Sequence, residues 1–298
     1  MTKKVILAAS SGNTGCSLAL IGTLMGYEVI IITNAKCSDE KQTHIRSNGA
    51  TLWLAEDLPA KFPSELGDTT DYMLQEDLLF AAHPGKYYSV NQYNNVDNRD
   101  AHYGSTGMEV WEQTQGAVTH FCMAASTGGT IQGVGAYLKE RKPGVEVVLA
   151  DPDKSRLKGL LQEGRGNAAE GAETLAAVEA AIEKTGGVKV EGAGKEALTE
   201  LMKPPATGKV LEFVDRAIAV NDFDAFDECR ATAANGLLVG GSAGLNLVAA
   251  KVVAEECALE APREGGVTIV TLLCDHGIKY LSKVFNDKWC SDNDTRGK

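Results

Sequence analysis

Basic residues are few for a chain of this size. The 298 residues include 29 Lys and Arg against 40 Asp and Glu, which gives a formal net charge of −11. A chain with this excess of negative charge is repelled by a phosphate backbone and by an anionic lipid surface. The composition therefore excludes nucleic acid and the membrane surface as main partners.

Long hydrophobic runs are also missing. No stretch approaches the roughly 20 apolar residues that a membrane-spanning helix needs. The N-terminal stretch 2–9 has a short apolar part that runs directly into a polar loop, so it is interpreted as a strand and not as a signal peptide. We expect a soluble, cytoplasmic protein.

Paired cysteine motifs are missing. The seven cysteines are odd in number, form no Cys-x-x-Cys pair and have no histidine cluster at ligand spacing. A disulfide framework or a zinc site is not expected, and reduced thiols in a cytosol-like compartment are the simpler interpretation. Cys274, two residues before His276, is the one cysteine with a nucleophile-like neighbour, and we interpret it as structural.

The apolar residues are arranged in a βαβαβ rhythm. Strands are predicted over 5–9, 27–33 and 50–54, with helices over 16–25 and 38–48 between them. Alternation of this kind predicts an α/β fold with parallel sheets and helices on both faces. Further helices are predicted over 70–82, 103–113, 131–140, 174–183, 222–235, 245–256 and 278–285, and strands over 87–90, 118–124, 145–151 and 267–273. Residues 58–67 are predicted to be a loop, and 287–289 together with 291–298 a frayed end.

The stretch Ser10-Ser11-Gly12-Asn13-Thr14-Gly15 lies where the first strand meets the first helix. Backbone N–H groups and the helix dipole favour an anionic ligand at such a junction. An ordinary capped turn has the same composition, because Ser, Thr and Asn are common N-caps. Spacing alone does not decide between these two interpretations.

Two further polar loops follow predicted strands. Ser126-Thr127-Gly128-Gly129-Thr130 is a Gly-rich loop between a strand and a helix, a pattern that holds phosphate with N–H and hydroxyl donors. It has no P-loop lysine, so a single phosphate monoester fits better than a triphosphate. Asn91-Gln92-Tyr93-Asn94-Asn95 is rich in amides, which can hold a carboxylate or simply form a turn.

These motifs resemble those of one enzyme family. Ser11-Gly12-Asn13-Thr14-Gly15 is similar to the substrate loop of the pyridoxal-phosphate enzymes of the cysteine synthase and cystathionine β-synthase family. Ser126–Thr130 resembles the family's phosphate loop, and Gly240-Gly241-Ser242-Ala243-Gly244 its pyridine-nitrogen loop. The resemblance covers nearly the whole chain and is weakest over 154–214.

The resemblance implies a cofactor, a set of roles and a fold. Pyridoxal 5'-phosphate would be held by Asn13 at its ring oxygen, by Ser126, Thr127, Gly128, Gly129 and Thr130 at its phosphate, and by Ser242 at its pyridine nitrogen. Ser10, Ser11, Thr14 and Gln92 would hold the carboxylate of an amino-acid substrate. The implied fold is that of tryptophan synthase β-like pyridoxal-phosphate enzymes, with two doubly wound parallel-sheet domains over 1–104 and 105–298, the ligand between them, and a homodimer as the assembly.

The resemblance also implies a missing part. Family members carry a Schiff-base lysine a few dozen residues before the substrate loop, whereas ten residues precede Ser11 here. Lys3 and Lys4 begin the strand whose other end carries the loop, roughly 20 Å away at about 3.3 Å per residue. An N-terminally truncated chain with little or no β-replacement activity is therefore expected, with Lys195 as the best internal substitute.

Three functions remain as hypotheses. The first is β-replacement on serine or an activated serine with a thiol or sulfide, most like cystathionine β-synthase, with cysteine synthase acting on O-acetylserine as its alternative. The preference rests on 240–244 and on Asp287-Lys288-Trp289, and Lys195, where cystathionine β-synthases usually have a Tyr, counts against it. The second is a catalytically inactive protein that binds cofactor or amino acid on the same fold. The third, a dinucleotide-binding protein, lacks a Gly-x-Gly-x-x-Gly after a strand.

Overall fold

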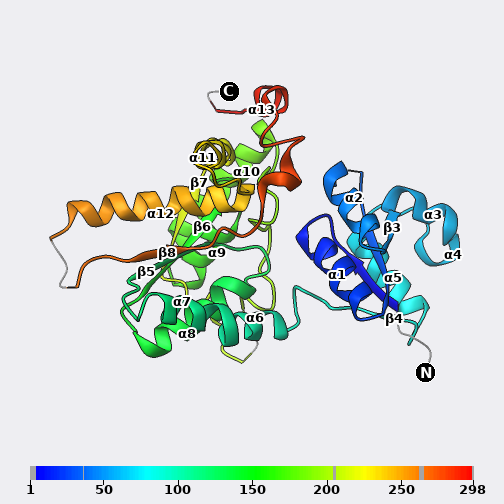
Figure 1. Ribbon diagram of the computed structural model, residues 1–298, viewed down its shortest axis with the longest axis horizontal. Helices are drawn as coiled ribbons and strands as arrows, with labels where there is room; N and C mark the ends of the chain where they lie inside the picture. Colours follow the sequence, from blue (N-terminus) through cyan, green and yellow to red (C-terminus); the bar gives the residue numbers. More distant parts are fainter. Residues whose placement is uncertain (1–4, 36, 204–205, 262–264, 297–298) are drawn as a thin grey trace. The chain divides into compact units, whose positions relative to one another are not determined.

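The computed structural model describes residues 5–35, 37–203, 206–261 and 265–296, and Lys3 and Lys4 lie outside them. The chain forms two compact units, Met1–Asn91 and Gln92–Lys298 (Figure 1). The expected boundary at Gly104 falls inside the second unit. The reason is that three consecutive helical segments, α6 (Asp97–Ala101), η2 (His102–Thr106) and α7 (Gly107–Gln113), all pack against α8 (Gly129–Arg141) of that unit.

The first unit contains a four-stranded sheet in the order β3-β2-β1-β4, with every pair parallel. Its strands are β1 (Val5–Ala9), β2 (Glu28–Thr33), β3 (Thr51–Leu54) and β4 (Tyr87–Tyr88). Near-continuous apolar runs form β1 and β2, as expected for strands covered on both faces.

Alternate residues of these strands bury two separate faces. Leu7 and Ile32 pack with Leu58 and Leu79 on one face, and Ile31 packs with the first helices on the other. The helices of this unit are α1 (Asn13–Leu24), α2 (Asp39–Ser47), η1 (Ala55–Asp57), α3 (Leu58–Lys61), α4 (Pro63–Leu66) and α5 (Tyr72–Ala82).

The second unit contains a parallel sheet in the order β7-β6-β5-β8. Its strands are β5 (His120–Ala124), β6 (Glu146–Pro152), β7 (Arg216–Val220) and β8 (Ile269–Thr271). Besides the three helical segments and α8 named above, its helices are α9 (Leu157–Gly164), α10 (Ala168–Thr185), α11 (Asp222–Ala234), α12 (Gly241–Leu259), η3 (Gly277–Tyr280) and α13 (Asp287–Asn293).

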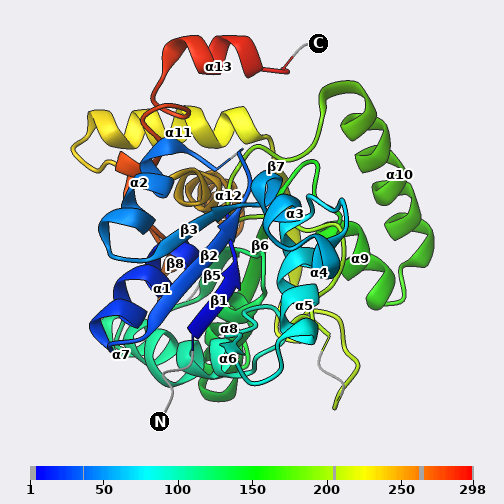
Figure 2. The ribbon, with the colours of Figure 1, turned by 90° about the vertical axis from the view of Figure 1, so that its right-hand side faces the viewer.

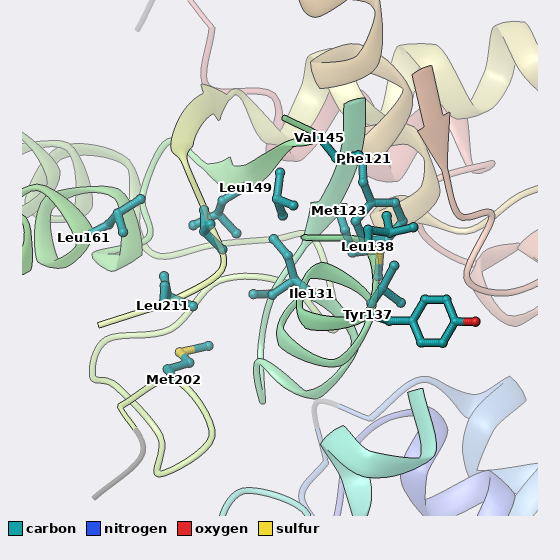
Figure 3. Close-up of a cluster of buried hydrophobic side chains, with 14 of the residues drawn as sticks. Phe121, Met123, Ile131, Tyr137, Leu138, Val145, Leu149, Leu161, Met202 and Leu211 are labelled. Atoms are coloured by element: carbon teal, nitrogen blue, oxygen red, sulfur yellow. The ribbon is translucent and has the colours of Figure 1, made fainter. Parts of the chain in front are cut away.

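The core of the second unit lies on both faces of its sheet. On one face Phe121 and Leu149 pack against Ile131 and Leu138 of α8 (Figure 3). On the other face the strands pack against α11 and α12, while α10 lies against α9 (Figure 2). The predicted α/β fold with two doubly wound parallel sheets is confirmed.

Several predicted elements were wrong. Residues 58–67 form two short helices, α3 and α4, each with a proline in its first turn. Proline is tolerated there because the backbone N–H that it lacks would have no partner within the helix. The helix predicted over 278–285 is only the short 3₁₀ segment η3, and the frayed end contains α13, whose N-cap Asn286 accepts a hydrogen bond from Trp289 N. Neither α9, in the weakly matching region, nor β7, just after that region, was predicted. Among the described residues, none of the helices combines the length and apolar character that a membrane span requires.

Candidate functional site

The loop between β5 and α8 has the geometry of an anion cradle. Gly128 has φ 87°, a left-handed conformation that glycine adopts freely, and the Met202 side chain occupies the space of a Cβ there. The first turn of α8 leaves backbone N–H groups without intrahelical partners. The 13-residue helix begins at Gly129, with no side-chain cap from the described residues, so its positive end points at the loop.

Asn98 fixes one side of this loop. Its Nδ2 donates to the Gln92 carbonyl at 2.8 Å and to Thr127 Oγ1 at 3.2 Å. A Cβ on Gly129 would lie 2.0 Å from Asn98 Oδ1, so only glycine allows this approach. The amide-rich tip, from which Gln92 comes, is thereby joined to the Gly-rich loop.

The two threonine hydroxyls are already oriented. Thr127 Oγ1 accepts from Asn98 Nδ2 and from Gly129 N at 3.3 Å, which leaves its O–H to donate to a ligand. Thr130 Oγ1 lies 3.1 Å from His102 Nε2, and His102 Nδ1 lies 2.9 Å from Thr106 Oγ1. Burial lowers the pKa of His102, so the ring is neutral at pH 7.

A second Gly-rich segment lies beside the start of the loop. Gly194 N donates to Ala125 O at 2.8 Å, and Thr199 Oγ1 donates to Thr127 O at 2.6 Å. The ammonium of Lys195 lies 4.0 Å from the centre of the Tyr93 ring. The segment 192–199 therefore borders the same loop as the amide-rich tip.

Ser242 lies in the first turn of α12 and is mostly buried. Asn246, in the second turn of α12, joins two strand ends. Its Oδ1 accepts from Ala124 N at 2.7 Å, and its Nδ2 donates to Leu272 O at 2.9 Å. Asn246 Nδ2 also donates to Cys274 Sγ at 3.5 Å, and burial raises the pKa of that thiol. A raised pKa keeps this thiol protonated, which agrees with a structural role and not with that of a nucleophile.

The residues of the first predicted loop come together in the first unit. Ser10 is buried, and its Oγ accepts from Gly12 N at 3.3 Å and from Gly15 N at 3.0 Å, so it fixes the turn that starts α1. The half-buried residues Ser11, Asn13 and Thr14 follow it.

Glu76 connects this loop to the segment 89–91, which leads into the amide-rich tip. Its carboxylate accepts from Ala9 N at 2.9 Å and from Ser89 Oγ at 3.1 Å, and Ser89 Oγ in turn accepts from Asn91 N. Burial raises the pKa of Glu76. The carboxylate thus holds the ends of β1 and of the segment after β4 in register.

Sequence reasoning missed several residues that build these loops: Glu76, Asn98, His102, Thr199 and Asn246. The signal for Asn98 was available, because the amide-rich run 91–95 continues to it within the next helical turn. His102 and Asn246 lie inside helices, where polar residues are common and their partners come from distant segments.

Pyridoxal phosphate fits the arrangement in the second unit. A phosphate monoester requires several N–H and O–H donors around one point, and the helix start, Thr127 and Thr130 supply them. The backbone at Gly129, which carries no side chain, allows a ligand to approach closely. The neutral Ser242 hydroxyl, at the start of α12, offers an uncharged partner for a ring nitrogen. These donors suit a single phosphate group attached to an aromatic ring.

Comparisons with known proteins agree with this geometry. A cysteine synthase of Aquifex aeolicus is 34% identical over 96% of this chain and 74% of its own length. A cystathionine beta-synthase of Rattus norvegicus is 32% identical over 95% of this chain and 44% of its own length. The crystal structure of an O-acetyl serine sulfhydrylase of Entamoeba histolytica superposes with a TM-score of 0.72 at 29% identity, covering 95% of this chain and 72% of that one.

One family model spans most of the chain. The model described as "Pyridoxal-phosphate dependent enzyme" matches residues 1–275. This range includes all three predicted motif loops. The chain therefore belongs to the family of pyridoxal-phosphate dependent enzymes.

Proposed function

We propose that this protein binds pyridoxal phosphate and serves β-replacement on serine or O-acetylserine, with a thiol or sulfide as second substrate. The observation that carries the proposal is the geometry of the loop 126–130. The Thr127 and Thr130 hydroxyls and the N-terminus of α8 lie together there, beside the close approach of Asn98 to Gly129. Relatives named cysteine synthase and cystathionine beta-synthase support the reaction class.

The residues of the chain have separate tasks in this proposal. The loop 126–130 holds the phosphate, Asn13 the ring oxygen, and Ser242 the ring nitrogen. Ser10, Ser11, Thr14 and Gln92 hold the substrate carboxylate. In a cytoplasmic homodimer, as we propose for this protein, each chain would bring its own set of these residues.

Pyridoxal phosphate, when bound, supplies an electron sink for chemistry at the α and β carbons of an amino acid. Ser242 tunes that sink, because a neutral hydroxyl does not hold the ring nitrogen protonated as an Asp would. A milder sink suits loss and replacement of a group at Cβ. The amides and hydroxyls around the carboxylate add no charge that would compete with it.

The two β-replacement functions differ in their second substrate. Lys195 borders the loop and places a cation over Tyr93, so a second substrate that carries a negative charge is favoured there. Both sulfide and a thiol amino acid meet this condition. We therefore keep cysteine synthase and cystathionine β-synthase activity as equal candidates.

Binding tests the cofactor assignment. Thr130→Ala should weaken pyridoxal phosphate binding about tenfold, the loss of one hydrogen bond to a charged group, without unfolding the protein. Ser242→Asp should retain binding and shift the absorbance of the bound cofactor, because a carboxylate beside the ring nitrogen stabilises its protonated form. If both variants bind with wild-type affinity and wild-type spectrum, the roles are wrong.

Turnover separates an enzyme from a binding protein that does not react. Product is measured with O-acetylserine and sulfide, and with serine and homocysteine, alongside borohydride treatment and peptide mapping of any lysine joined to the cofactor. Product together with a labelled lysine supports the enzyme. Tight cofactor binding with neither result supports the second candidate, an inactive homologue. This candidate is favoured because the Lys195 ammonium is engaged in a cation–π contact with the Tyr93 ring.

A further inference from the structure

One cysteine of the second unit lies beside a histidine from a distant part of the chain. Cys257 is half-buried near the end of α12, and its Sγ lies 3.7 Å from Nε2 of His120, the first residue of β5. The two residues are 137 positions apart, so no local motif joins them. They meet because α12 packs against β5 and β8 (Figure 1).

The hydrogen bonds of His120 assign its ring protons. Thr119 Oγ1 donates to Thr268 O at 3.0 Å and lies 2.8 Å from His120 Nδ1, so Nδ1 carries a proton and donates it to this hydroxyl. In the neutral ring Nε2 is then the acceptor, and Nε2 is the nitrogen that faces Cys257 Sγ. His120 is 1% exposed, so the surrounding core holds the ring in this orientation.

A carboxylate completes the arrangement. Glu146 Oε2, on the neighbouring strand β6, lies 3.3 Å from His120 Nε2. An ionised carboxylate only accepts hydrogen bonds, so it stabilises the ring once Nε2 has taken a proton. Arg216 of β7 pairs with both Glu146 and Glu256. A nucleophile, a base within reach and a group that stabilises the charged base are the parts that activate a thiol.

The other cysteines of the chain are in different surroundings. Four of them are buried: Cys16, Cys37, Cys122 and Cys229. Burial raises the pKa of the Cys274 thiol. Cys290 is half-buried like Cys257, but its sulfur contacts the Arg230 guanidinium, which does not accept a proton, and burial raises the pKa of this thiol as well. Cys290 is therefore an internal reference for Cys257.

We propose that Cys257 is a modification site that exchanges with small disulfides, with His120 as its base and Glu146 as the carboxylate that stabilises the protonated ring. The Cys257 S–H gives its proton to His120 Nε2, and the thiolate attacks one sulfur of the disulfide. The S–S bond of the reagent breaks, and a new S–S bond joins Cys257 to one half of it. The other half leaves as a thiolate and takes the proton from the imidazolium, so one thiol and one disulfide yield one thiol and one disulfide.

The probe is 2-hydroxyethyl disulfide, which has no amine and so does not condense with the aldehyde of pyridoxal phosphate. The full chain, with pyridoxal phosphate added, is treated at neutral pH, and the adduct on each cysteine is quantified over time by peptide mass. We expect the mixed disulfide to form at least about tenfold faster on Cys257 than on Cys290. Equal rates at the two cysteines, or no adduct on Cys257, would overturn the proposal.

Two variants test the base. His120→Gln removes the proton acceptor, and Glu146→Gln, at a half-buried position, removes the charge that stabilises the imidazolium. Each should slow the modification of Cys257 about tenfold at neutral pH. The difference from the wild type should shrink as the pH rises past about 8.5, where a thiolate forms without a base. A purely structural perturbation would not give this pH profile.

His44→Gln, on a half-buried histidine of α2 in the first unit, is the matched control and should leave the rate unchanged. A wild-type rate in folded Glu146→Gln contradicts the proposal even if His120→Gln fails to fold. The adduct is measured on one thiol and requires no turnover, so a negative result leaves the proposed function standing.

Discussion

The backbone of Gly129 leaves no space for a side chain, because a Cβ there would lie 2.0 Å from Asn98 Oδ1. Gly129→Ala must displace Asn98 and so break its hydrogen bonds to Gln92 and Thr127. We expect pyridoxal phosphate to bind at least tenfold more weakly, as measured by fluorescence titration. Gly144→Ala is the matched control, because nothing lies within 4 Å of a Cβ at that turn. Equal affinity of the two variants would show that the Asn98 contact does not shape the site.

The buried carboxyl of Asp151 makes stability depend on pH. Burial raises its pKa from 3.8 to about 7, so between these values the folded protein holds a proton that the unfolded chain releases. The stabilisation is complete below about pH 4 and is lost as the pH rises toward 7. Raising the pH from 5 to 8 should therefore lower the free energy of unfolding.

Asp151→Asn isolates this effect from other groups of the same sign, such as Glu76 and Asp222, whose pKa values burial also raises. In the variant, the decrease in unfolding free energy between pH 5 and 8 should be smaller by about 2–3 kcal/mol. Urea unfolding at both pH values measures it, with Glu183→Gln as control. An unchanged pH dependence would mean that Asp151 is ionised throughout.

At the scale of elements, α13 depends on aromatic packing. The Trp289 ring lies 6.3 Å from that of Phe223 and 5.9 Å from that of Phe226, and Arg230 pairs with Asp287 at 2.6 Å. Trp289→Ala should cost about 2–3 kcal/mol of unfolding free energy, less than a fully buried aromatic because Trp289 is half-buried. Lys288→Ala, on the exposed side of the same helix, should cost less than about 0.5 kcal/mol. Urea denaturation distinguishes them, and equal values would mean that α13 does not pack as described.

The sequence predicts elements well where one local signal is enough. Apolar runs such as 5–9 and 27–33 identify β1 and β2, because a strand covered on both faces leaves its pattern in the chain. Residues 278–285 have a helical pattern, yet Gly277–Tyr280 form a 3₁₀ helix and residues 281–285 form turns. Tyr280 Oη donates a hydrogen bond to Asp275 Oδ2 at 2.8 Å. A tertiary contact of this kind leaves no periodic signal.

The same distinction applies to the site. The loops at 10–15, 126–130 and 240–244 are contiguous, so their residues could be named from the chain alone. Asn98, Thr199 and Glu76 act on loops far away in sequence, and only the folded backbone shows these pairings. Sequence therefore names candidate ligand contacts within contiguous loops, whereas the residues that hold these loops in place are found only in the fold.

At the scale of the whole molecule, the proposed ligand contacts are divided between the two units. Ser10, Ser11, Asn13 and Thr14 belong to the first unit, and Gln92, the loop 126–130 and Ser242 to the second. One cofactor engaging both sets is the central claim of the proposed function. It requires that loops built by separate sheets act on a single molecule.

A crystal structure of the chain with pyridoxal phosphate tests this claim most directly. We predict that the phosphate lies within hydrogen-bond distance of the backbone N–H groups at the start of α8 and of the Thr127 and Thr130 hydroxyls. Ser242 Oγ should lie at the ring nitrogen and Asn13 at the ring oxygen. A cofactor bound elsewhere, or one that contacts the loop 126–130 while Asn13 lies out of reach, would contradict it.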